Sequence, residues 1–179
     1  MKHSSKVALC GMICALCTVC MFMTGLFPFA TYALPAIAGV LLCVVVIELS
    51  PRWALVVYLA VSCLSFLLSP DREAALFFVA FFGHYPTLKY IIECTRSRLL
   101  QYVMKFSLFN VCVISAFLLL LYLFRLPNLM EEFGELGKYG VWGLLVLGNI
   151  TFAVYDFALS RVILTYLNWF RPRFLKRHS

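Results

Sequence analysis

The chain has 179 residues, of which 64% are hydrophobic and only 13% are charged. An average soluble domain is about 25% charged, so this composition excludes a soluble monomer. The 15 Lys and Arg outnumber the 8 Asp and Glu, an excess that we read as membrane topology rather than as nucleic-acid binding. We expect an all-α, polytopic membrane protein with six transmembrane helices in one bundle, forming a single integral membrane domain over residues 1–179.

Six apolar stretches are predicted as spans, since a spanning helix needs about 20 residues. In chain order they are Val7–Phe27, Tyr32–Leu49, Trp53–Leu68, Ala74–Glu93, Val103–Leu123 and Gly140–Thr165. Turn residues at Ser50–Arg52 and Ser69–Glu73 separate the second, third and fourth stretches. Residues Arg125–Tyr139 form the longest hydrophilic stretch and are predicted as a connection.

The fourth stretch contains the sequence Gly83-His84-Tyr85-Pro86. Proline lacks a backbone donor and cannot continue the hydrogen-bond ladder of a helix. A kink or a broken helix is therefore predicted here, at a place where neighbouring helices satisfy the released carbonyl.

The positive charges indicate the orientation of the spans. The six-span scheme places twelve of the 15 Lys and Arg on one side, and only Arg72, Arg125 and Lys138 on the other. Cytoplasmic loops carry the excess of Lys and Arg in membrane proteins. The sequence therefore predicts a multi-pass protein of the plasma membrane, surrounded by lipid, with both termini in the cytoplasm.

Catalytic motifs for zinc, nucleotides or an activated serine are absent from the sequence, which has only three histidines. We expect no enzymatic activity, no cofactor, no metal and no nucleic-acid partner. Cys10, Cys14, Cys17 and Cys20 share one face of the first span, where small residues serve close packing. Packing is preferred to a metal site for these cysteines, and no disulfide framework is expected.

Three polar residues fall at similar depth near the centres of three spans: His84, Asn110 and Asn149. Polar side chains in the hydrocarbon region are costly unless they pair or face a cavity. They therefore form either hydrogen bonds between helices or the floor of a ligand pocket. Aromatic residues nearby are either lipid-facing or part of the walls of such a pocket. The candidate substrate-binding residues are His84, Tyr85, Asn110, Asn149, Phe81 and Trp142.

A second polar layer, nearer the cytoplasm, contains Lys89, Lys105 and Asp156. An isolated charge at that depth is expensive. We expect an intramembrane ion pair in which Asp156 is the counter-ion of Lys105 or Lys89, with a structural role rather than one in proton coupling.

Ala8, Gly11 and Ala15 lie within about 60° on one face of the first span, because each residue turns a helix by about 100°. Small residues let another helix approach closely. The face serves either packing within the chain or docking of a second membrane protein.

The chain resembles the substrate-binding S components of energy-coupling factor vitamin transporters. The resemblance covers the whole chain in plan: its size, a basic start at Lys2–Lys6, and outer connections at Phe29–Ala33 and Arg125–Tyr139. In that family an Ala-x-x-x-Ala pattern on the first helix docks a transmembrane coupling subunit. The nearest match here is Gly11–Ala15, with Ala8 one turn earlier.

The resemblance implies binding of a vitamin or a similar small-molecule ligand from outside, with ATP hydrolyzed by separate ATPase subunits. The alternative is a non-catalytic membrane scaffold, for example in cell-envelope morphogenesis. Such a scaffold also needs no catalytic residues, and a ligand pocket would distinguish the two.

Overall fold

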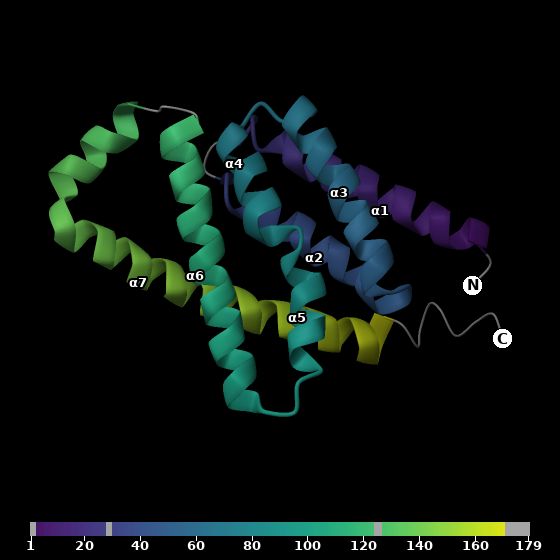
Figure 1. Ribbon diagram of the computed structural model, residues 1–179. Coiled ribbons are helices and arrows are strands. Elements are labelled where there is room, and N and C mark those ends of the chain that lie inside the picture. The colour runs from purple at the N-terminus through teal and green to yellow at the C-terminus, as the bar shows by residue number, and fades with distance from the viewer. Residues whose placement is uncertain (1–2, 28–29, 124–126, 171–179) are drawn as a thin grey trace. The chain divides into compact units, whose positions relative to one another are not determined.

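The computed structural model describes residues 3–27, 30–123 and 127–170, and these ranges are helical apart from short connections (Figure 1). The elements are α1 (His3–Met23), α2 (Ala33–Glu48), α3 (Pro51–Leu68), α4 (Arg72–Phe77), η2 (Phe78–Phe82), α5 (Tyr85–Glu93), α6 (Arg98–Leu123), α7 (Pro127–Thr165) and η3 (Tyr166–Phe170). Strands are absent from the described ranges. The predicted all-α class is confirmed.

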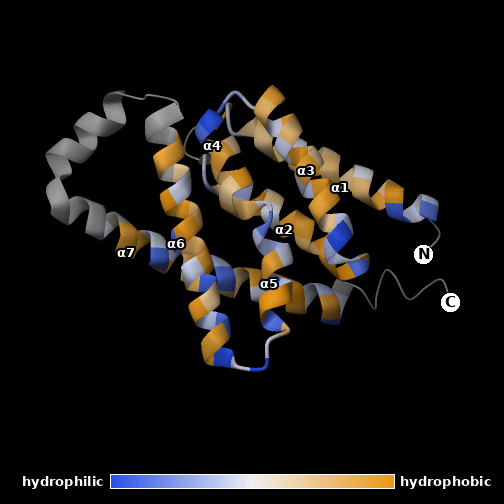
Figure 2. Ribbon diagram, viewed as in Figure 1, coloured by the Kyte–Doolittle hydropathy of each residue, from blue (hydrophilic) through white to orange (hydrophobic). Residues whose placement is uncertain are grey.

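Five stretches of the described chain are long and apolar enough to cross a membrane. They are His3–Met23, Pro51–Leu68, Arg72–Glu93, Arg98–Ala116 and Leu145–Trp169, and α2 is a shorter apolar helix of 16 residues. At 1.5 Å per residue α2 is about 24 Å long. In Figure 2 hydrophilic residues gather at the start of α4 and at the connection between α5 and α6. The chain is a polytopic membrane protein.

The chain divides into two compact units, Met1–Leu126 and Pro127–Ser179. The first contains α1 to α6 and the second contains α7 and η3. The expectation of a single membrane domain over the whole chain stays a prediction.

The core of the first unit lies between α1, α2 and α3. Its fully buried side chains include Cys17 and Met21 of α1, Ala38 and Val45 of α2, and Val61 of α3. The Cys17 thiol donates a hydrogen bond to the Ala38 carbonyl oxygen at 3.4 Å, and all eight cysteines are free thiols. Cys17 therefore packs as a small hydrophobic residue, as the sequence predicts.

The predicted break in the fourth span is confirmed. The span consists of α4, the π-helical turn η2 and α5, and Pro86 lies in the first turn of α5. The Gly83 amide donates to the Phe78 carbonyl at 2.8 Å, five residues back. The fourth span therefore contains one wide turn, which ends four residues before Pro86.

The predicted connection at Arg125–Tyr139 is helical in the part that the structure describes, and the apolar stretch of spanning length begins only at Leu145. Residues from Pro127 onward belong to α7, a helix of 39 residues. Proline is favoured at the first position of a helix because its fixed φ suits that position. Leu, Met and Glu are strong helix formers, so a hydrophilic stretch can continue as helix.

Candidate functional site

The two candidate aromatic residues of the fourth span lie in the protein interior. Tyr85 is fully buried and Phe81 is 3% exposed. Their ring centroids are 4.8 Å apart, and the Phe81 ring also meets the Phe109 ring of α6 edge to face at 5.3 Å. These aromatic side chains therefore join the fourth span to α6 rather than facing lipid.

His84 lies in a polar cluster formed by the wide turn. Its Nδ1 atom is 3.3 Å from the Val79 carbonyl oxygen, and its Nε2 atom is 3.8 Å from the Cys112 Sγ of α6. The Tyr58 hydroxyl of α3 donates to the same Val79 carbonyl at 2.8 Å. The structure thus brings His84 together with two residues, Tyr58 and Cys112, that sequence reasoning did not select.

The two candidate asparagines bond to their own helices. The Asn110 amide donates to the Phe106 carbonyl at 2.8 Å, and the Asn149 amide donates to the Leu145 carbonyl at 2.8 Å. Asn149 belongs to the second unit, and the Trp142 side chain lies outside the described residues. The predicted layer of His84, Asn110 and Asn149 stays a prediction.

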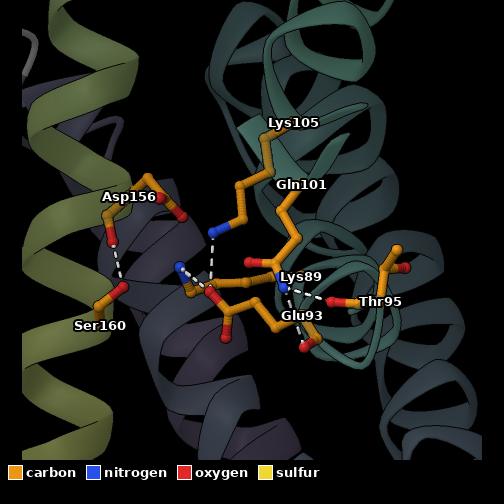
Figure 3. A network of polar contacts seen from close by, with 7 residues as sticks. All are labelled: Lys89, Glu93, Thr95, Gln101, Lys105, Asp156 and Ser160. Carbon is orange, nitrogen blue, oxygen red and sulfur yellow. Dashed lines mark hydrogen bonds and ion pairs between the residues drawn. The ribbon is translucent and has the colours of Figure 1, made fainter. Parts of the chain in front are cut away.

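The two buried lysines of the first unit share the carboxylate of Glu93 (Figure 3). The Oε1 atom of Glu93 is 2.9 Å from Lys89 Nζ and 2.7 Å from Lys105 Nζ. The lysine side chains are 1% and 6% exposed, whereas that of Glu93 is 41% exposed. The contact with Lys105 joins α6 to α5, whereas the contact with Lys89 lies within α5. Charge-assisted contacts of this length are among the strong hydrogen bonds of proteins.

Sequence reasoning missed Glu93, although the i, i+4 spacing of Lys89 and Glu93 is the usual spacing of an ion pair within a helix. The predicted pairing of Asp156 with these lysines stays a prediction. Within α7 the Asp156 carbonyl oxygen accepts a hydrogen bond from the Ser160 hydroxyl at 2.9 Å.

The connection after α5 is fixed by the side chain of Gln101 (Figure 3). Its Nε2 atom donates to the Thr95 carbonyl at 2.6 Å and to the Glu93 carbonyl at 3.3 Å. The last carbonyls of a helix lack partners within the helix. Gln101 satisfies two carbonyls there, next to the shared carboxylate.

The opposite end of the first unit carries a second polar cluster, which sequence reasoning also missed. Thr31 donates to Asp71 Oδ2 at 2.9 Å, and the Tyr32 hydroxyl donates to Glu73. Partial burial and the Glu73 carboxylate raise the pKa of the Tyr32 phenol. The Thr24 and Ser69 hydroxyls are 3.3 Å apart in the same region. These contacts hold the α1–α2 connection against the α3–α4 connection.

The candidate docking residues Ala8, Gly11 and Ala15 are all exposed on α1. A Cβ atom added at Gly11 would have no heavy atom within 4 Å. An apolar groove of about 670 Å³ begins beside Gly11 and Ala15 and extends to Leu64 and Leu68 of α3. In the part of the chain that the structure describes, this face of α1 is exposed.

Comparison with known proteins found no matching family model, no matching curated protein and no matching solved structure. Among the described residues, no group of three or more His, Cys, Asp and Glu side chains could hold a metal ion. Support for a function therefore comes from the geometry of the chain itself.

Proposed function

We propose that the chain is a membrane-embedded substrate-binding subunit for uptake of a vitamin or a similar small micronutrient. A transmembrane coupling subunit and separate ATPase subunits would power the uptake. The observation that supports this proposal best is the exposed face formed by Ala8, Gly11 and Ala15. A subunit without its own energy source requires a surface on which its partner docks.

The geometry of α1 favours the docking alternative over packing within the chain. The side of α1 that packs inward carries Ile13, Cys17 and Met21, whereas Gly11 faces open space. Small residues at such a face let the backbone of a second helix approach closely. Dispersion contacts are strongest at that short distance.

The orientation proposed for this subunit follows from its charge distribution. With both termini in the cytoplasm of the plasma membrane, the cluster around Thr31 and Asp71 faces outside and Glu93 lies toward the cytoplasm. Reporters fused at Pro70 and after Ser179 should then report opposite sides. An external reporter after Ser179 would contradict the orientation.

Substitution of Gly11 tests the docking face. Gly11→Leu should abolish copurification with a coexpressed coupling subunit while leaving the unfolding temperature of the isolated chain unchanged. Met12→Leu is the matched control, since Met12 is exposed on the adjacent side of α1 and receives the same residue. Overpacking typically costs about 1–3 kcal/mol. If Gly11→Leu lowers the stability of the isolated chain by that amount, the face packs internally and the docking assignment is wrong.

Native mass spectrometry of the purified chain separates the transporter from the scaffold. A small molecule that copurifies and stays bound in Gly11→Leu supports a substrate-binding subunit. A chain that docks partners through this face but carries no small molecule under any preparation would instead be a scaffold.

A further inference from the structure

His84 and Cys112 meet in the interior of the first unit, although they are 28 residues apart in sequence. His84 lies between η2 and α5, and Cys112 belongs to α6. The distance from His84 Nε2 to Cys112 Sγ is 3.8 Å. An imidazole and a thiol are both ligands of soft transition-metal ions.

The orientation of the His84 ring is set by the wide turn. A carbonyl oxygen can only accept, so the contact of 3.3 Å with Val79 requires Nδ1 to donate. A neutral imidazole that donates from Nδ1 carries its lone pair on Nε2. Histidine ligands of metals are ordinarily fixed in this way, by a hydrogen bond from the other ring nitrogen to a carbonyl or carboxylate.

Tyr58 supports the same arrangement from a third helix. Its hydroxyl donates to the Val79 carbonyl at 2.8 Å, and its ring meets the His84 ring edge to face at 5.8 Å. A Cβ atom at Gly83 would overlap the Tyr58 ring, so glycine is needed for the ring to lie there. Val79 of η2 and Tyr58 of α3 therefore orient the Nε2 atom of His84 toward Cys112 of α6. Such π-helical turns are frequent at functional sites.

We propose that His84 Nε2 and Cys112 Sγ form a two-ligand site for a soft monovalent cation, Cu(I) or its analogue Ag(I). This proposal does not depend on the transport function proposed above. The thiol proton is released to solvent when the metal binds, because the ligand is the thiolate. One thiolate, one neutral imidazole and one monovalent cation together carry no net charge.

Charge distinguishes this cation from zinc. A divalent ion on the same two ligands would leave a net positive charge within the span, where charge is expensive. Structural zinc also takes four ligands, and the described residues offer no group of three. Thiolate ligands favour Cu(I).

The distance between the two ligand atoms suits an ion between them. Bonds as long as those of zinc to nitrogen and sulfur, about 2.0 and 2.3 Å, would place the two ligand atoms about 4.3 Å apart in a linear arrangement. The two ligand atoms are 3.8 Å apart. They can hold such an ion in a bent geometry, or in a linear one if they move apart by about 0.5 Å. Rotation of the Cys112 side chain supplies that movement without a change in the helices.

Competition for Cu(I) against a chromogenic chelator tests the site, with the full-length chain in detergent under anaerobic conditions. Wild-type protein should retain one Cu(I) per chain. The variants Cys112→Ser and His84→Leu should each bind Cu(I) at least tenfold more weakly than wild type. Cys63→Ser is the matched control, because Cys63 is an exposed thiol of α3, and it should bind like wild type. Equal Cu(I) affinity in wild type and Cys112→Ser would overturn the proposal.

A labelling experiment on the unmodified chain gives the same answer if a variant fails to fold. Cu(I) should slow alkylation of Cys112, read by peptide mass spectrometry, and should leave alkylation of Cys63 unchanged. Protection confined to the α1 thiols Cys10, Cys14 and Cys20, with Cys112 alkylated at the same rate with and without Cu(I), would overturn the proposal.

Discussion

The fourth span and α1 are both apolar enough to cross a membrane, but they differ in burial and in regularity. Among the 18 most apolar consecutive residues of each span, 56% are buried in Arg72–Glu93 and 22% are buried in His3–Met23. The buried span contains the wide turn η2, a proline and two ion-paired residues, whereas α1 is one uninterrupted helix. Irregular backbone and charge occur where neighbouring helices supply hydrogen-bond partners, as the membrane requires. The regular helix instead presents an outward face.

Removing the shared carboxylate should produce the largest loss in the buried span. Glu93→Gln removes the carboxylate charge that the ammonium groups of Lys89 and Lys105 both contact. Breaking a buried ion pair from one side costs several kcal/mol, and the partial exposure of Glu93 reduces this to about 3 kcal/mol. Thermal unfolding in detergent measures the loss.

Wild-type protein in the same detergent is the reference for Glu93→Gln. If Glu93→Gln unfolds at the temperature of wild type, Glu93 does not hold α5 to α6.

Identical substitutions at two glycines compare the two spans directly. Gly83→Ala places a Cβ atom against the Tyr58 ring and 3.0 Å from the Phe78 ring, and should destabilise by about 1–3 kcal/mol. Gly11→Ala meets nothing within 4 Å and should be neutral or stabilising by up to about 1 kcal/mol, since alanine favours the helix. Equal effects on the unfolding temperature would remove the distinction between a packed glycine and an open one.

A smaller effect is expected where the buried span begins. Asp71 accepts from the Ala74 amide at 3.1 Å and from the Thr31 hydroxyl at 2.9 Å. Asp71→Ala should therefore cost about 1 kcal/mol through loss of the N-cap. Asp71→Asn keeps a capping oxygen and should unfold at a temperature close to that of wild type. If Asp71→Asn loses as much stability as Asp71→Ala, the charge of Asp71, rather than the capping hydrogen bond, stabilises the helix start.

The sequence predicts the spans and the break in the fourth span because both depend on local properties. Apolar length and the missing amide of Pro86 act on the residues beside them. The fold class and the helix break are therefore predictable from short stretches of sequence.

The site was harder to predict, because its contacts join distant helices. An apolar span looks similar on the side that faces lipid and on the side that faces protein, so the burial of Phe81 and Tyr85 has no periodic signature. The pairing of Lys105 with Glu93, and of Cys112 with His84, depends on how α6 packs against the fourth span. Neither distance can be read from residue spacing.

The wide turn η2 also affects how the fourth span tolerates changes in length. A π-helical turn accommodates one more residue than an α-helical turn, so deleting one residue within Phe78–Phe82 would let the backbone close as ordinary α-helix while α4 and α5 keep their facing surfaces. The same deletion within α3, which has no such turn, would rotate everything after it by about 100°. The shortened fourth span would keep its packing but lose the wide turn that presents the Val79 carbonyl to His84. The extra residue of this turn is therefore needed for the orientation of His84 but not for the packing of the span.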